Sequence, residues 1–295
     1  MPLLTAFLLL VAASGMWAVD YIRVPELWLS VLISQCLAVV NGVMLCVTLY
    51  RAKATNRFSL LPAVLFVSAV AVFPYLRMHW QPQLLVCVLL FFLYSTRGIS
   101  DTHEPNGLVF FVTLLLCLTA LLVKDALWCI VFLWAVVLLQ GVFSFRTIIA
   151  SLLAVLLVGV YYTVALYFGW AEVWDVSVLY ERHWFGNDQP VSLTTAVCVI
   201  LFAFLLVTAG AFRRSSYDLV SARMLLYHVV VCGLLSLPLI LFMPAVPDSL
   251  VLLPFSLSAV TAVFLSQKES ETRGVTLLLY LTGAVVLFLW LVLSL

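Results

Sequence analysis

Charged residues are scarce in this chain. Lys and Arg number 14 and Asp and Glu number 13 among 295 residues, whereas 66% of the residues are apolar. A water-soluble domain has about a quarter of its residues as Asp, Glu, Lys and Arg, so the composition excludes a soluble globular protein. The net charge of +1 provides no basic surface for a nucleic acid, and no nucleic-acid partner is expected.

Side chains for metal or thiol chemistry are equally sparse. The four histidines and seven cysteines show no metal-ligand spacing, and no two cysteines form a CxxC pair. No phosphate-binding glycine loop and no nucleophile elbow is found. The sequence therefore predicts no metal, no cofactor and no thiol chemistry.

Apolar runs separated by short polar islands make up most of the chain. A helix of about 20 apolar residues crosses the hydrocarbon core of a bilayer. We therefore predict one domain, 1–295, that is an all-α polytopic transmembrane bundle of about eleven spans, with the first retained rather than cleaved as a signal. The spans are 3–19, 28–49, 58–76, 81–96, 107–123, 126–145, 148–168, 192–212, 224–243, 249–266 and 275–294.

Two pairs of runs are separated by very short islands. Arg77-Met78-His79 divides the third run from the fourth, and because each is only just long enough to span, a re-entrant pair is the alternative. Only Lys124-Asp125 divides the fifth from the sixth. Unbroken, 107–145 would form a helix about 58 Å long at 1.5 Å per residue, so we predict a tight hairpin at Lys124-Asp125.

The basic residues indicate the orientation. If the N-terminus is cytoplasmic, most Lys and Arg fall in inner loops, and only Arg23, Arg77, Lys124 and Arg182 fall in outer loops. This is the asymmetry of the positive-inside rule. It predicts a cytoplasmic N-terminus and an external C-terminus.

The longest predicted loop, 169–192, lies on the outer side and is rich in acidic residues and tryptophan. A helix over 171–184 would be amphipathic and would lie in the membrane interface. If the loop binds a substrate, its candidates are Asp175 and Arg182 for catalysis and Glu172, Trp174, His183 and Trp184 for substrate binding. The alternative, an aromatic belt and a solvated loop, is favoured because spacing alone fixes no catalytic geometry.

Asp20, at the outer end of the first run, is a further catalytic candidate. Membrane glycosyltransferases that use polyprenyl-phosphate sugars place an acidic residue at this point, and the chain is similar to them in that position only. Their first outer loop is long, whereas here only eight residues, Asp20 to Leu27, are available. A helix-end carboxylate paired with Arg23 is therefore the favoured interpretation.

Polar residues inside the runs are few. They are Gln35, Asn41, Gln140 and His228, and no Asp, Glu, Lys or Arg lies in the middle of a run. Charges are retained in the bilayer core where ions or protons are relayed, so their absence disfavours an ion-coupled carrier. Any transport cavity would be lined by Gln35, Asn41 or Gln140.

Several motifs follow one another between about residues 50 and 170. They are Asn56-Arg57-Phe58-Ser59-Leu60-Leu61-Pro62, the polar loop from Asp101 to Asn106, Phe145-Arg146 and Tyr161-Tyr162. Their order resembles a family of uncharacterised polytopic inner-membrane proteins found in Bacteroidota. The resemblance implies a multi-pass protein of a Gram-negative inner membrane and carries over no catalytic residue.

Three functions remain open at this point. The first is a component of envelope biogenesis that packs with membrane lipids and other envelope proteins. The second is a membrane glycosyltransferase or polysaccharide polymerase acting on a lipid-linked sugar, and the third is a lipid or solute transporter. The first is preferred because it requires no cluster of catalytic side chains.

Overall fold

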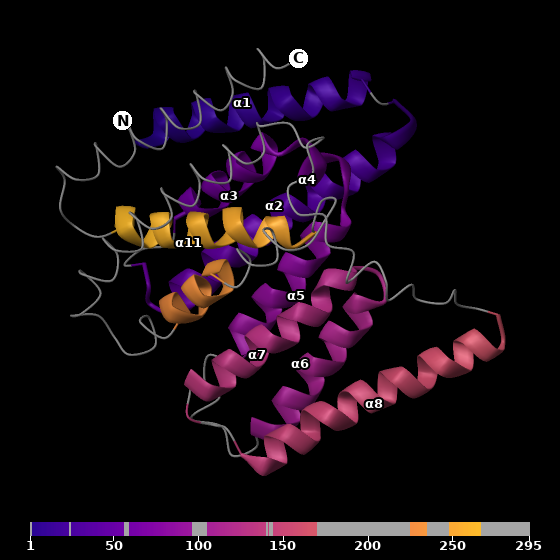
Figure 1. Ribbon diagram of the computed structural model, residues 1–295. Helices are drawn as coiled ribbons and strands as arrows, with labels where there is room; N and C mark the ends of the chain where they lie inside the picture. The colour runs from indigo at the N-terminus through magenta and orange to yellow at the C-terminus, as the bar shows by residue number, and fades with distance from the viewer. Residues whose placement is uncertain are drawn as a thin grey trace, which may run out of the picture.

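Figure 1 shows the protein as a computed structural model. It describes residues 2–23, 25–55, 59–95, 105–139, 141, 144–169, 225–234 and 248–266. These residues form helices and the turns between them, without any strand. The prediction of an all-α protein is confirmed for this part of the chain.

The N-terminal part consists of five helices that follow the predicted runs. They are α1 (Pro2–Arg23), α2 (Trp28–Arg51), α3 (Leu61–Val72), α4 (Pro74–Met78) and α5 (Gln81–Ser95), with the 3-10 turn η1 (Pro25–Leu27) between the first two. The predicted run 58–76 is broken near its end. Phe73 is extended (φ −96°, ψ 112°). The ring of the next residue, Pro74, clashes with the backbone of Phe73 and disfavours the helical conformation there.

The middle part contains α6 (Pro105–Ala120), the 3-10 turn η3 (Lys124–Leu127), α7 (Trp128–Leu139) and α8 (Phe145–Tyr167). The predicted break at Lys124-Asp125 is confirmed, because α6 ends before it and α7 begins after it. Ser144 starts α8 with a capping box. Its hydroxyl accepts from the Thr147 N–H at 3.2 Å, and the Thr147 hydroxyl accepts from the Ser144 N–H at 2.9 Å.

Towards the C-terminus the structure describes the helix Leu225–Leu234, the 3-10 turn η5 (Asp248–Val251) and α11 (Leu252–Ser266). The predicted runs 192–212 and 275–294 lie outside the described residues. Every residue from Val251 to Val263 is buried, so α11 is a central helix. It packs on α3, and the Ser256 hydroxyl donates to the Val229 carbonyl at 2.9 Å.

Two described helical stretches, Pro25–Arg51 and Phe145–Tyr167, are long and apolar enough to cross a membrane. The described part also contains shorter apolar helices of 10–17 residues, among them Leu61–Ala71, Gln81–Ser95 and Asn106–Ala120. By length and composition alone, therefore, the structure supports two spans. The eleven-span count rests on the sequence pattern.

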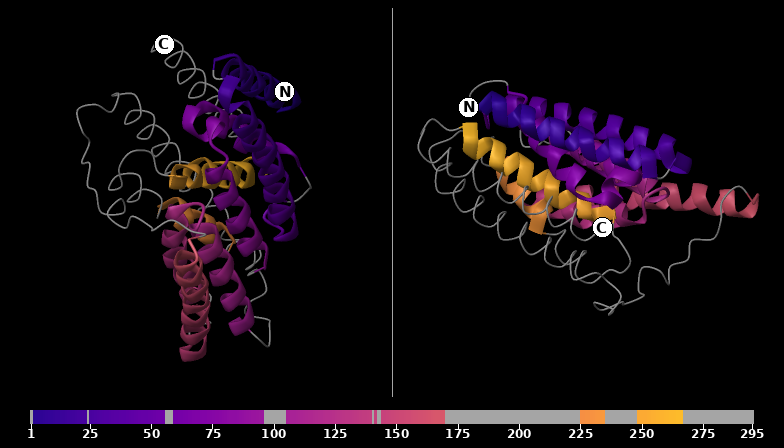
Figure 2. Two further views of the ribbon diagram at one scale, coloured as in Figure 1. Left: turned by 90° about the vertical axis from the view of Figure 1, so that its right-hand side faces the viewer. Right: turned by 90° about the horizontal axis from the view of Figure 1, so that it is seen from above.

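The helices pack in two groups. In one, α1 and α2 lie against α3, and α5 lies against α2; in the other, α6 lies against α8. Figures 1 and 2 show α8 at the edge of the molecule, with its C-terminal end projecting away from the other described helices. One side of α8 is therefore covered by α6, while much of its remaining surface is uncovered.

The crossing of α2 and α3 depends on small side chains. Ser34, Ala38 and Gly42 are buried on α2 at intervals of four residues, so they share one face of the helix. A Cβ atom at Gly42 would lie 3.0 Å from the Ala63 Cα atom and 3.1 Å from the Ala63 Cβ atom. Small residues of this kind allow helix backbones to approach closely.

We expect Gly42→Ala to destabilise the protein by about 1–3 kcal/mol, because the added methyl group forces α2 and α3 apart. The free energy of unfolding of the purified protein in detergent measures this. Gly159→Ala in α8 is the matched control, because no atom lies within 4 Å of the added Cβ and alanine favours a helix by about 1 kcal/mol over glycine. Equal stability changes in the two variants would contradict the proposed close crossing.

Candidate functional site

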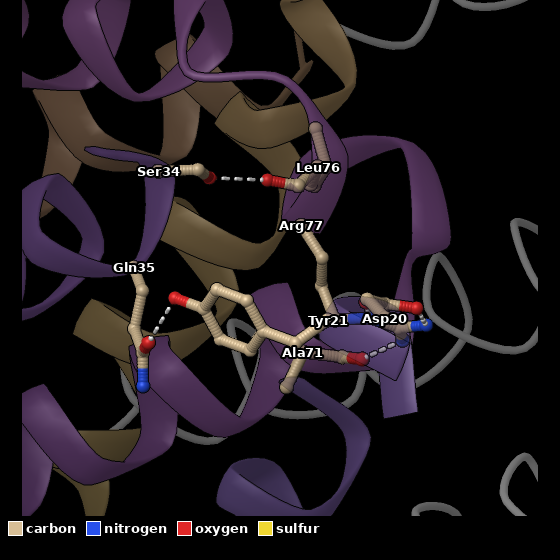
Figure 3. A network of polar contacts seen from close by, with 7 residues as sticks. All are labelled: Asp20, Tyr21, Ser34, Gln35, Ala71, Leu76 and Arg77. Carbon is tan, nitrogen blue, oxygen red and sulfur yellow. Dashed lines mark hydrogen bonds and ion pairs between the residues drawn. The ribbon is translucent and has the colours of Figure 1, made fainter. Parts of the chain in front are cut away.

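Asp20 and Arg77 form an ion pair in the interior of the helix bundle. Asp20, near the end of α1, is 2% exposed, and Arg77, in α4, is 7% exposed. The Arg77 Nε donates to Asp20 Oδ2, and Nη2 donates to Oδ1 at 3.1 Å. Both carboxylate oxygens are therefore engaged by one guanidinium group, in the bidentate geometry that favours arginine over lysine. Figure 3 shows this pair and the polar contacts around it.

The broken helix explains the position of Arg77. The Arg77 Nη1 also donates to the Ala71 carbonyl, which lies in the last turn of α3. Carbonyls at a helix end have no intrahelical partner, and Pro74 has no N–H to offer. Arg77 therefore neutralises Asp20 and at the same time satisfies the backbone where α3 ends.

Hydroxyl groups of α2 satisfy the backbone of α4. The Ser30 hydroxyl donates to the Met78 carbonyl at 2.6 Å, and the Ser34 hydroxyl donates to the Leu76 carbonyl at 2.8 Å. The two serines are one turn apart and so face α4 together. Since α4 has only five residues, its carbonyls depend on such external donors.

Two further contacts involve the amide side chains that the sequence singled out. The Tyr21 hydroxyl donates to Gln35 Oε1 at 3.1 Å, which joins α1 to α2 (Figure 3). Asn41 Nδ2 donates to the main-chain carbonyl of Gln83 at 2.8 Å, which joins α2 to α5. Gln140, the third residue predicted to line a transport cavity, lies outside the described residues.

The opposite side of α4 contacts the C-terminal part of the chain. The Tyr75 hydroxyl donates to Asp248 Oδ1 at 2.8 Å, and Asp248 is the first residue of η5. The His79 ring lies 4.5 Å from the Tyr75 ring, centroid to centroid. Partial burial there lowers the pKa of His79 below its ordinary value. α4 therefore binds α1 through Arg77 and η5 through Tyr75.

The structure pairs Asp20 with Arg77, 57 residues further along the chain, whereas the side chain of its predicted partner, Arg23, lies outside the described residues. Within the polar island Arg77-Met78-His79, the Arg77 side chain is buried. The sequence signal for an unusual position of this arginine is Pro74, the first residue of α4. It breaks an apolar helix and turns the arginine that follows into the bundle.

The remaining site candidates are on the outer loop 169–192. Glu172, Trp174, Asp175, Arg182, His183 and Trp184 all lie outside the described residues. The structure therefore places Asp20 of the seven candidates and leaves the other six as sequence predictions. Gln83, which the sequence analysis missed, is brought to Asn41 although it lies in an otherwise apolar run.

No protein-family model, curated protein or solved structure matches the chain. The interpretation of the site therefore depends on its geometry and on the sequence pattern.

We expect Asp20→Leu and Arg77→Met, made singly, each to destabilise the protein by about 3–5 kcal/mol, because either change leaves a buried charge without its partner. The double variant should recover most of that loss, since both charges are then gone. Unfolding free energies of the four proteins form a double-mutant cycle that measures the coupling. Glu26→Gln removes an exposed carboxylate and should change stability by less than about 0.5 kcal/mol. Additive effects of the two single changes would show that the ion pair contributes nothing.

Proposed function

We propose that the protein is a non-enzymatic, multi-pass component of a bacterial inner membrane. In this role it packs with membrane lipids and with other proteins of envelope biogenesis, in the eleven-span arrangement with a cytoplasmic N-terminus and an external C-terminus. The observation that carries the proposal is the surface of α8.

α8 is buried on one side only, and most of its exposed side chains are apolar. The buried residues are Thr147, Ser151, Ala154 and Val158, and the Ser151 hydroxyl lies 3.2 Å from that of Thr113 on α6. The exposed side chains include Ile149, Leu152, Leu153, Leu156, Val160 and Val164. In water, such a surface would drive aggregation, whereas lipid chains cover it at no cost. At 1.5 Å per residue the helix is about 34 Å long, which matches the bilayer core.

α2 shows the same division between a packed face and an apolar outer face. Its small and polar residues face α3, α4 and α5, whereas Leu29, Leu32, Ile33, Val40 and Val43 are exposed. Both stretches that are long enough to span thus present apolar side chains outward. A soluble protein rarely exposes apolar surface of this extent, so this arrangement supports a lipid surrounding.

Contacts between helix ends support the prediction that the first spans cross the membrane in alternating directions. Asp20 and Arg77, both in predicted outer segments, are paired. At the predicted inner ends of α2 and α5, the Arg51 Nη1 donates to the Tyr94 hydroxyl. Because Met78 contacts Ser30 and Tyr94 contacts Arg51, the segment 78–94 follows α2 over about 31 Å. This length favours a full crossing over a re-entrant loop.

The use of the polar side chains favours a packing role over catalysis. Both oxygens of Asp20 are occupied by Arg77, and Ser30, Ser34 and Asn41 donate to main-chain carbonyls. These groups stabilise contacts between helices. A glycosyltransferase acting on a lipid-linked sugar remains the alternative hypothesis, and it depends on the loop 169–192.

We expect Leu156→Lys to destabilise the protein by about 2.5–3.5 kcal/mol, because it places a charge near the bilayer centre. Tyr167→Lys should have little effect, since a lysine at the helix end extends to the interface. Both residues are strongly exposed, at 63% and 85%, so in water both changes would be harmless. The yield of membrane-inserted protein and its unfolding free energy measure the difference. Equal tolerance of the two lysines would refute the lipid-facing position of α8.

We expect Asp175→Ala/Arg182→Ala and Asp20→Leu/Arg77→Met, once inserted at the normal level, each to rescue the envelope phenotype of a deletion strain fully. A packing role needs no catalytic side chain, and the second variant removes both members of the ion pair together. Growth under envelope stress measures the rescue, with membrane levels checked by immunoblot. Loss of rescue by a variant that is inserted at the normal level would reject the non-enzymatic role and favour the glycosyltransferase.

A further inference from the structure

We infer that the buried amides of Asn41 and Gln83 bind one neutral, water-sized molecule between α2 and α5. The molecule donates a hydrogen bond to Asn41 Oδ1 and accepts one from Gln83 Nε2. This inference is independent of the proposed function, because it rests on the hydrogen bonding of these two side chains alone.

The two amides face each other, and each has one polar atom without a hydrogen-bond partner. Both residues are 0% exposed. Asn41 Nδ2 donates to the main-chain carbonyl of Gln83 at 2.8 Å and lies 3.5 Å from Gln83 Oε1. Asn41 Oδ1 and Gln83 Nε2 are buried and have no hydrogen-bond partner among the described residues.

Reversing either amide does not solve the problem. With the nitrogen and oxygen of Asn41 exchanged, its oxygen would face the Gln83 carbonyl oxygen at hydrogen-bond distance. With those of Gln83 exchanged, two NH₂ groups would face each other. The observed orientation is therefore the favourable one, and it leaves one acceptor and one donor for a third partner.

No described group forms a hydrogen bond with either atom. The buried positions one turn away are Ala38 and Leu45 on α2 and Val86 on α5, all apolar. Because an unpaired buried polar group is strongly unfavourable, a bound molecule that pairs both atoms stabilises the interface. Two neutral amides do not compensate a buried charge. The ligand is therefore neutral, and water is the smallest molecule that both donates and accepts.

The test compares Gln83→Met, which preserves side-chain volume but removes the donor, with the wild-type full-length chain in detergent. A bound water predicts that the midpoint of thermal unfolding falls by about 2–4 °C, because the water loses a partner and Asn41 Oδ1 is left unpaired. Without a bound molecule, the change removes an unpaired donor, and the midpoint stays constant or rises. Leu89→Met, at a fully buried apolar position of α5, controls for the introduction of methionine.

A crystal structure of the wild-type protein from a lipid mesophase gives the direct readout. We expect one ordered solvent peak within hydrogen-bond distance of both Asn41 Oδ1 and Gln83 Nε2, and no such peak in Gln83→Met. A wild-type map without this peak overturns the inference even if Gln83→Met is less stable, because the side chain then acts through packing alone. A constant or raised midpoint in Gln83→Met overturns it equally.

Discussion

The bidentate pair of Asp20 and Arg77 is the interaction on which the N-terminal part of this bundle depends. α4 is a single five-residue helix between two breaks, too short to be stable by itself. The pair fixes it to the end of α1, and the bond from Arg77 to the Ala71 carbonyl fixes it to the end of α3. On its other side, Tyr75 binds Asp248. One short helix thus connects the N-terminal helices to the central helix α11.

A broken helix in an apolar interior creates unpaired carbonyls, and these explain the polar residues of α2. In the lipid surrounding that we propose, bulk water does not reach these carbonyls, so the donors come mainly from the protein itself. Ser30 and Ser34 supply them to α4, and Asn41 gives the Gln83 carbonyl, in the first turn of α5, an additional donor. The same face of α2 carries Ala38 and Gly42, which let α3 approach. Hydrogen bonding and close packing therefore occupy one helix face, and the opposite face carries exposed apolar side chains.

This division connects the fold to the proposed role. A protein that packs among lipids and other membrane proteins needs apolar outer surfaces on a bundle held together from within. α2 and α8 provide these outer surfaces, and α11, which is buried all round, provides the interior. The polar side chains around α4 hold helices together, and the other candidates for a catalytic role that the sequence names lie in the loop 169–192.

The sequence by itself determined the helical class and the break at Lys124-Asp125, because apolar periodicity and short polar islands are local properties. It also determined the positions of the helices that the structure describes, apart from the break at Phe73-Pro74. It did not determine which apolar helix is central. The segments 148–168 and 249–266 look alike in composition, yet α8 lies at the edge and α11 in the centre, since that choice depends on which helices pack around them. Nor could it pair Asp20 with Arg77 or Asn41 with Gln83. Residues so distant in the chain meet only when the break at Phe73-Pro74 sets the path of α4 and α5, and that path is fixed by tertiary packing.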